Sequence, residues 1–112
     1  MPYQVNGKTI ESDANGYLSD PNDWSEELAR LIAAEEEIEL TERHLDVLNY
    51  LREEWFDNNN NQPNERTILK AMSARWDGST TSKDLYDLFP KMPSKQGGKI
   101  AGLPESRRKG GY

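Results

Sequence analysis

Residues 41–57, TERHLDVLNYLREEWFD, decide the fold, because their apolar side chains recur at the spacing of an α-helix. Residues three or four positions apart lie on the same face of a helix. Here that face would consist of Leu45, Leu48, Leu51 and Trp55, with Val47 and Phe56 beside it. Thr41 is a favoured residue type for the position before a helix. We therefore expect a helix from about Glu42 to Asp57 with one buried face.

A second helix is predicted before this stretch. The segment Asp20–Asp23 offers capping residues and a proline suited to an early helical position. The helix would run to about Glu36, where consecutive glutamates oppose the helix dipole. Its buried face would consist of Trp24, Leu28, Leu31 and Ile32.

Two shorter helices are predicted after the polar loop 58–63. The first covers about Glu65–Trp76, and the second begins after Thr81 and ends before Pro90. Their inward-facing side chains would be Ile68, Leu69, Met72, Trp76, Leu85, Leu88 and Phe89. Because a four-residue turn joins them, the two helices have the outline of a helix-turn-helix.

The N-terminus predicts a β-hairpin. The dipeptide Asn6-Gly7 tolerates the positive φ angles of a type I′ turn, and the short segments Tyr3–Val5 and Lys8–Ile10 flank it. Two short strands are only marginally stable alone, so this ribbon should lie against the helices. The expected fold class is mainly α (α+β): a small helical bundle with a helix-turn-helix-like pair, an N-terminal hairpin and a flexible C-terminal arm.

Composition limits the possible functions. The chain has 112 residues, of which 34% are hydrophobic, so we expect one domain with a modest core. It contains no cysteine, which excludes disulfides, thiolate metal sites, a cysteine nucleophile and a persulfide on these residues. No apolar run approaches the roughly 20 residues that span a bilayer. Because no signal peptide is visible either, we expect a cytoplasmic protein without a membrane partner.

Charge divides the chain into an acidic body and a basic end. From Lys91 onward six bases accompany one acid, which leaves +5, whereas the first 90 residues hold 19 acids and eight bases, which leaves −11. Proline and glycine are frequent after Pro90 and apolar residues are few. We therefore expect a helical domain over residues 1–90 and a basic flexible arm over 91–112. The arm would either seek an anionic surface or remain solvated.

Catalytic patterns are missing from the sequence. His44 is the one histidine, and its place in the first turn of an amphipathic helix favours a structural role. The acidic runs 35–37 and 53–54 are typical of solvated helix faces. No cluster has the spacing of metal ligands, and no glycine loop suited to a phosphate follows a strand. We predict neither a metal nor a cofactor.

DNA binding is an alternative that the helix pair keeps open. The second helix offers Lys83 to DNA, but Asp84 and Asp87 lie beside it and would repel phosphates. An acidic body also opposes phosphate binding, although the basic arm could add contacts.

Several blocks resemble the DsrC/TusE family of sulfur-relay proteins. In chain order they are Asp13–Leu18, Asn22–Trp24, Ile38–Thr41, His44, Leu51–Arg52, Pro63, Arg66, Lys70–Met72, Leu85–Lys91 and Lys99–Pro104. The last two blocks are the most specific. The resemblance covers nearly the whole chain and implies a hairpin, a helix-turn-helix-like pair and a mobile C-terminal arm.

Members of that family transfer sulfur through cysteines of the C-terminal arm, and this is the activity that the resemblance implies. TusE-type members accept a persulfide on a penultimate cysteine from a TusBCD-like complex and pass it to a tRNA 2-thiolation enzyme. DsrC-type members carry a second cysteine before the Lys-Ile-Ala-Gly-Leu-Pro block and serve dissimilatory sulfite reductase. Here these positions correspond to Gly98 and, loosely, Gly111, so neither can carry sulfur.

We therefore predict a non-catalytic protein, not an enzyme. It would bind or regulate partners of the sulfur-relay (TusBCD- or DsrEFH-like) or sulfite-reductase type through its scaffold and arm. The predicted partner-binding residues are Lys91, Lys95, Lys99, Ile100, Gly102, Leu103, Pro104, Arg107 and Arg108. One alternative is a DNA-binding transcription regulator of sulfur metabolism genes, and another is sulfur transfer through a cysteine supplied by a partner.

Overall fold

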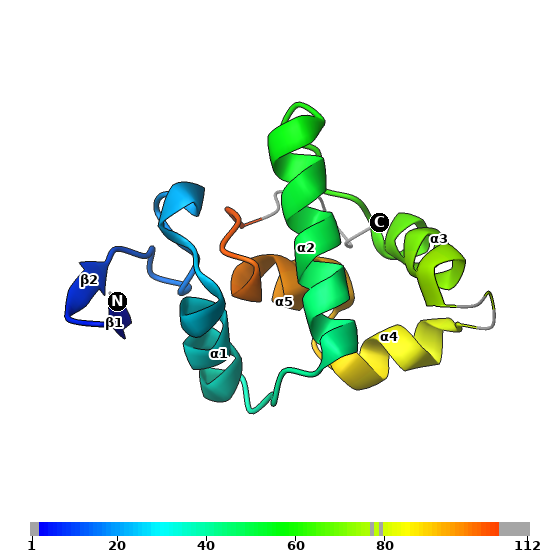
Figure 1. Cartoon of the computed structure of the whole chain (residues 1–112), viewed down its shortest axis with the longest axis horizontal. Helices are drawn as coiled ribbons and strands as arrows, with labels where there is room; N and C mark the ends of the chain where they lie inside the picture. Colours follow the sequence, from blue (N-terminus) through cyan, green and yellow to red (C-terminus); the bar gives the residue numbers. More distant parts are fainter. Residues whose placement is uncertain (1–2, 77, 79, 106–112) are drawn as a thin grey trace.

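The computed structural model describes residues 3–76, 78 and 80–105. Figure 1 shows a small hairpin at one end of the molecule and helices packed around a common core. The elements in chain order are β1 (Tyr3–Val5), β2 (Lys8–Ile10), the 3₁₀ helix η1 (Pro21–Asp23), α1 (Glu26–Glu35), α2 (Glu42–Asp57), α3 (Glu65–Trp76), α4 (Ser82–Leu88) and α5 (Pro93–Ile100). The predicted mainly helical fold with an N-terminal hairpin is confirmed.

The hairpin forms as its turn sequence predicts. β1 and β2 pair antiparallel, with Tyr3 opposite Ile10, and Asn6 and Gly7 have φ angles of 51° and 79°. These positive values are those of a type I′ turn. Tyr3 and Ile10 are buried and β1 contacts α1, so the ribbon is stabilised by packing on the helical body.

The first long helix begins later than predicted. Asp20 caps only η1, and the backbone then becomes extended at Trp24. The side chain of Ser25 accepts a hydrogen bond from the N–H of Leu28 and so caps α1. Trp24 therefore lies outside α1, where its side chain contacts a more distant part of the chain.

α2 has the predicted bounds, and His44 connects its first turn to α4. The N–H of Thr41 donates to Nδ1 of His44 at 3.0 Å, so Nε2 carries the proton that it donates to the carbonyl of Leu88 at 2.9 Å. The imidazole lies edge-on to Phe89 at 5.1 Å. Burial lowers the pKa of His44, against the opposing effect of its bond to Leu88. These contacts give His44 a structural role.

α3 and α4 are consecutive helices in contact with each other. As expected, Thr81 begins the second one: its N–H donates to the carboxylate of Asp84 at 2.8 Å. This bond lowers the pKa of Asp84. Residues 77 and 79 of the predicted turn lie outside the described residues.

The structure corrects the predicted start of the arm. Residues 93–100 form α5, which packs against α1, α2, α3 and α4 and lies behind α2 in Figure 1. The compact body therefore includes this segment and does not end at residue 90. Tertiary packing overrides the poor helix propensity of glycine here. A Cβ atom at Gly97 would lie only 3.2 Å from Cδ1 of Leu51, so glycine permits the close approach of α2.

The core draws on nearly every element. Its fully or largely buried side chains include Tyr3, Ile10, Leu18, Leu28, Ile32, Val47, Leu48, Leu51, Ile68, Met72, Leu85, Phe89, Ile100 and Leu103. Because α5 lies among these residues, it fixes the position of the segment 101–105 that follows it.

Candidate functional site

The structure gathers most of the predicted partner-binding residues around α5 and the segment that follows it. We call this region the exit site. It consists of backbone residues 100–105 and the four side chains that hold them, which are Asn15, Trp24, Arg52 and Gln62.

The N-terminus of α5 is capped by another helix. Met92, the residue before α5, has a φ of 100° and no capping side-chain bond. Instead, the carboxylate of Glu65 at the start of α3 accepts a hydrogen bond from the N–H of Ser94. A carboxylate at this position pairs a free N–H and complements the helix dipole. α3 therefore positions the beginning of α5.

The C-terminus of α5 is a Schellman motif. Leu103 donates its N–H to the carbonyl of Gly98 at 3.0 Å, and Gly102 donates to that of Lys99 at 3.1 Å. Gly102 has a φ of 76°, and a Cβ atom there would lie 2.5 Å from Cδ1 of Trp24. Both facts require glycine. The Lys-Ile-Ala-Gly-Leu-Pro block is therefore the end of a buried helix.

Two side chains from other segments bind the last carbonyls of this helix end. Nε1 of Trp24 donates to the carbonyl of Ile100 at 2.8 Å, and Nη1 of Arg52 donates to that of Ala101 at 2.8 Å. The guanidinium also lies 4.4 Å from the Trp24 ring centre and 4.9 Å from that of Phe56. Burial lowers the pKa of Arg52, yet arginine remains charged. A cation at a helix C-terminus is favoured by the helix dipole.

The segment beyond the turn is held as well. Nε2 of Gln62 donates to the carbonyl of Pro104 at 2.8 Å. Nδ2 of Asn15 donates to the carboxylate of Glu105 at 2.9 Å. One bond comes from the loop between α2 and α3 and the other from the segment between β2 and η1, and together they hold residues 104 and 105.

A partly buried ion pair locks α5 to α1. Nζ of Lys99 lies 3.0 Å from Oε2 of Glu36, and the two side chains are 19% and 15% exposed. Gln96 donates to the other oxygen of Glu36 at 3.0 Å. Burial alone would raise the pKa of Glu36, but the bonds from Gln96 and Lys99 outweigh it and lower the pKa.

Lys99 also lies close to the N-terminal part of the chain. Nζ of Lys99 lies 6.0 Å from the ring centre of Tyr17. The hydroxyl of Tyr3 donates to the carbonyl of Gly16 at 2.6 Å. Burial, with the nearby carboxylates of Glu35 and Glu36, raises the pKa of Tyr3 to about 12. The hydroxyl therefore stays protonated and remains a donor at neutral pH.

These contacts change the roles of several predicted site residues. Ile100, Gly102 and Leu103 are buried, so in this structure they belong to the core. Lys99 is held by Glu36, whereas Lys91 is exposed and Lys95 and Pro104 are partly exposed. Arg107, Arg108 and Gly111 lie outside the described residues.

Gly98 is buried but has free space beside it. A Cβ atom at this position would meet no atom within 4 Å. The position that the family resemblance assigns to a second cysteine thus has room for a side chain, although glycine stands there.

Sequence reasoning missed the residues that hold the exit site. Trp24 was expected on the buried face of a helix. No contact with residues 94–105 was predicted for the other residues, which are Asn15, Glu36, Arg52, Gln62 and Glu65. Arginine on the otherwise apolar face of residues 45–55 was the one available signal, because a buried helix end needs donors.

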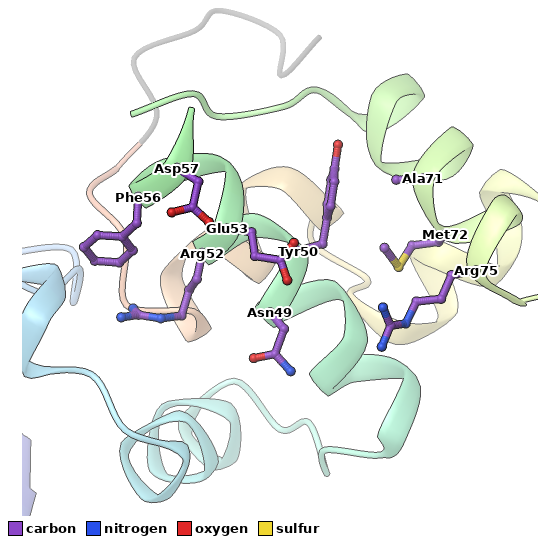
Figure 2. A pocket seen from close by; sticks show the side chains of 9 residues that line it. All are labelled: Asn49, Tyr50, Arg52, Glu53, Phe56, Asp57, Ala71, Met72 and Arg75. Carbon is purple, nitrogen blue, oxygen red and sulfur yellow. The ribbon is translucent and has the colours of Figure 1, made fainter. Parts of the chain in front are cut away.

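A pocket of about 470 Å³ lies beside the exit site, between α2 and α3 (Figure 2). Its lining residues are Asn49, Tyr50, Arg52, Glu53, Phe56, Asp57, Ala71, Met72 and Arg75. Arg52 therefore belongs both to the exit site and to this pocket.

The described residues contain neither a metal-binding cluster nor a helix that could span a membrane. In residues 3–76, 78 and 80–105, no three or more histidines, aspartates or glutamates lie close enough together to hold a metal ion. No helix in the described part of the chain is long and apolar enough to cross a membrane.

Comparisons with known proteins agree with the resemblance seen in the sequence. The model of the family described as "DsrC like protein" matches residues 4–108. The protein "Sulfurtransferase TusE" of Photorhabdus laumondii is 45% identical over 100 residues, which are 88% of this chain and 89% of that protein.

Solved structures show the same fold. The solution structure of Allochromatium vinosum DsrC has a TM-score of 0.87 at 38% identity and covers 96% of this chain and 98% of its own. The oxidized gamma-subunit of dissimilatory sulfite reductase (DsrC) from Archaeoglobus fulgidus has a TM-score of 0.88 at 31% identity, with the same coverage. On the family model, the 45% identical relative and the shared fold, this chain belongs to the DsrC/TusE family of sulfur-relay proteins.

Proposed function

We propose that this chain is a non-catalytic member of its family, which binds sulfur-relay or sulfite-reductase-type partners without carrying sulfur itself. The observation that carries the proposal is the absence of cysteine from all 112 residues of a chain that keeps the family fold. A thiolate is the nucleophile that accepts a sulfane sulfur, and glycine at position 98 offers no substitute. Binding is then the function that the scaffold retains.

Basic residues near the exit site would make the contacts with the partner. Lys91, Lys95, Arg107 and Arg108 are the proposed contact residues, since Lys91 and Lys95 are exposed or partly exposed and the other two follow shortly after Glu105. The turn at Gly102 and the contacts of Lys99 and Pro104 would act indirectly, because they fix the position of residue 105. Relatives named "Sulfurtransferase TusE" and "gamma-subunit of the dissimilatory sulfite reductase" support these two classes of partner.

A binding measurement tests the proposal. The full chain is immobilised and titrated with a purified TusBCD-type complex and with the catalytic subunits of a dissimilatory sulfite reductase. The test variant replaces Lys91, Lys95, Arg107 and Arg108 with glutamine. The matched control replaces the four exposed bases Lys8, Arg30, Arg66 and Lys70, which lie on other elements. We expect salt-sensitive binding that the test variant loses and the control keeps; no binding to either partner would refute the proposal.

The non-carrier part has its own test. The chain is incubated with a partner loaded with isotopically labelled persulfide, and both proteins are weighed by mass spectrometry. We expect the label on the partner alone. The variant Gly98→Cys is the control for detection, because the structure has room for a side chain there. Covalent label on the wild-type chain would contradict the proposal.

The DNA-binding alternative gains no support from the described residues. Lys83 is exposed, but its Nζ is paired with the carboxylate of Asp87 at 3.1 Å. The N-terminal part of α4 therefore offers the DNA phosphates no cationic side chain that is free of an acidic partner. The alternative stays a prediction, and we do not propose it.

A further inference from the structure

The chain contains two Asn-Gly pairs, and both lie in turns of its N-terminal part. They are Asn6-Gly7 and Asn15-Gly16, and the 112 residues contain no other such pair. Asparagine is among the thermolabile residues, because the backbone nitrogen of the next residue can attack its side-chain carbon Cγ. Glycine in the next position favours this attack, since it has no side chain to block the approach and its backbone moves freely. The two pairs are therefore chemically alike, and their surroundings decide how each behaves.

The first pair is exposed and held by no hydrogen bond. Asn6 and Gly7 form the tip of the hairpin, and both are exposed. Among the described residues, none bonds the side-chain amide of Asn6 or accepts from the N–H of Gly7. A Cβ atom at Gly7 would meet nothing within 4 Å. Asn6 also lines a pocket of about 270 Å³ bounded by the hairpin, η1 and the start of α1, so solvent reaches its amide.

The tip of the hairpin opens at little cost. The attack requires rotation of the backbone at Asn6, which the closed turn restricts, so the rate of reaction follows local opening. Opening the tip breaks only the pair Val5–Lys8, in which Val5 is partly buried and Lys8 is exposed. Tyr3 and Ile10, at the other end of the ribbon, can stay packed on the body. A two-stranded ribbon is only marginally stable by itself, so such opening is frequent.

The second pair is held on every side that the reaction needs. The N–H of Gly16, which is the nucleophile, donates to the carbonyl of Asp13 at 3.0 Å. Nδ2 of Asn15, which would have to leave, donates to the carboxylate of Glu105 at 2.9 Å. The N–H of Asn15 donates to the Asp13 carboxylate at 2.9 Å, and the carbonyl of Gly16 accepts from the hydroxyl of Tyr3. Reaction at Asn15 therefore requires several bonds to break together.

We propose that Asn6 is a site of spontaneous deamidation and that the fold protects Asn15 from the same reaction. The nitrogen of Gly7 loses its proton and bonds to Cγ of Asn6, while the bond from Cγ to Nδ2 breaks and ammonia leaves. Water then opens the cyclic imide at either carbonyl, which gives aspartate or isoaspartate without any oxidant or reductant. Isoaspartate lengthens the main chain of the turn by one methylene group, so the tip of the hairpin loses its pairing.

Ageing of the full chain in a mildly alkaline buffer tests the proposal. Trypsin cleaves after Lys8 and Arg30, so Asn6 and Asn15 fall in separate peptides, and mass spectrometry follows the replacement of amide by carboxylate in each. In the folded chain Asn6 should react about tenfold faster or more, which is the factor expected from two hydrogen bonds of typical net strength. In concentrated urea, where the chain is unfolded, the two rates should become similar.

A double variant tests the cause of the protection. Asp13→Ala with Glu105→Ala removes two carboxylates that bind Asn15, and should raise the rate at Asn15 several-fold toward that at Asn6. The matched control is Glu27→Ala with Glu39→Ala, two exposed acids on other segments, which should leave both rates unchanged.

The other outcomes would overturn the proposal. Equal rates in the folded chain, or a faster reaction at Asn15, would show that the fold does not distinguish the two pairs. A folded chain that stays intact at Asn6, when both sites react in urea, would show that the closed turn protects Asn6 as well. An unchanged rate at Asn15 in the folded double variant would contradict the assigned protection. No partner takes part, so the result is independent of the proposed function.

Discussion

α2 and α5 are both helices of the core, yet they depend on different parts of the sequence. α2 has 16 residues with an amphipathic pattern, and its capping groups, Thr41 and His44, lie within its own first turn. α5 has eight residues, two of them glycine, and Glu65, Trp24 and Arg52 complete its ends from other segments. Local sequence thus specifies α2, whereas the surrounding fold specifies α5.

The largest expected effect tests whether α5 is as much a part of the core as α2. Ile100→Ala should destabilise the protein by about 2–5 kcal/mol, as Leu48→Ala should in α2, because both side chains are fully buried. Urea unfolding measures both values. A cost below about 0.5 kcal/mol for Ile100→Ala, typical of an exposed position, would mean that residues 93–103 are a detached arm after all.

The next prediction concerns the contact between Gly102 and Trp24. Gly102→Ala should cost about 2–4 kcal/mol, because it adds backbone strain at positive φ and a clash with the indole. Gly7→Ala is the matched control, since Gly7 has a similar φ of 79° and nothing within 4 Å of its Cβ position. The difference in unfolding free energy between the two variants isolates the clash. Equal costs would show that Trp24 moves away freely.

The Glu36–Lys99 pair should contribute less and depend on pH. Lys99→Met leaves the carboxylate of Glu36 partly unpaired and should cost about 1–3 kcal/mol. Because the pKa of Glu36 is lowered in the folded state, its stabilisation is fully present above the unfolded value near 4.5 and is lost as the pH falls through the folded value. Unfolding of wild type and Glu36→Gln at several pH values measures this loss.

An exposed ion pair provides the control for that experiment. Lys83→Met breaks the pair with Asp87 on α4, whose side chains are 82% and 62% exposed, and should change stability by less than about 1 kcal/mol. A pH-independent difference between wild type and Glu36→Gln would contradict the assigned role of Glu36.

The smallest effect should have the opposite sign. Gly98→Ala should stabilise the protein by about 0.5–1 kcal/mol, because alanine favours the helix and its Cβ meets nothing within 4 Å. Gly97→Ala, one residue earlier, should not, since its Cβ would lie 3.2 Å from Leu51. Thermal unfolding of the two variants compares them directly. Destabilisation by Gly98→Ala would show that the space beside Gly98 is filled.

Elements with complete local signals were predicted correctly from the sequence. The pair Asn6-Gly7 specified the hairpin turn, and α2 and α3 begin and end where their apolar periodicity indicated. The break before α1 was not predicted, because Asp20 and Ser25 are both favoured capping residues and the sequence does not say which one begins the helix. In the structure Trp24 is extended, and its side chain binds the carbonyl of Ile100.

Most of the exit site could not be predicted, because its contacts join residues far apart in the chain. Trp24 and Ile100 are separated by 76 positions, and Arg52 and Ala101 by 49. The periodicity of apolar residues along the chain does not predict such long-range pairs. The glycines and prolines of residues 93–104 resemble a loop by composition, and only burial against four helices makes them a helix. The basic residues were found by sequence, but not the side chains that place them.

The Schellman turn has a consequence for how relatives of this protein are identified. Every residue from Lys99 to Pro104 has a task in ending α5: an ion pair, two buried side chains, a left-handed glycine, a buried leucine and a proline bonded by Gln62. A search signature built on these six letters consequently detects an architecture. It will collect chains with and without a thiol, and only inspection of positions outside the signature separates the two groups.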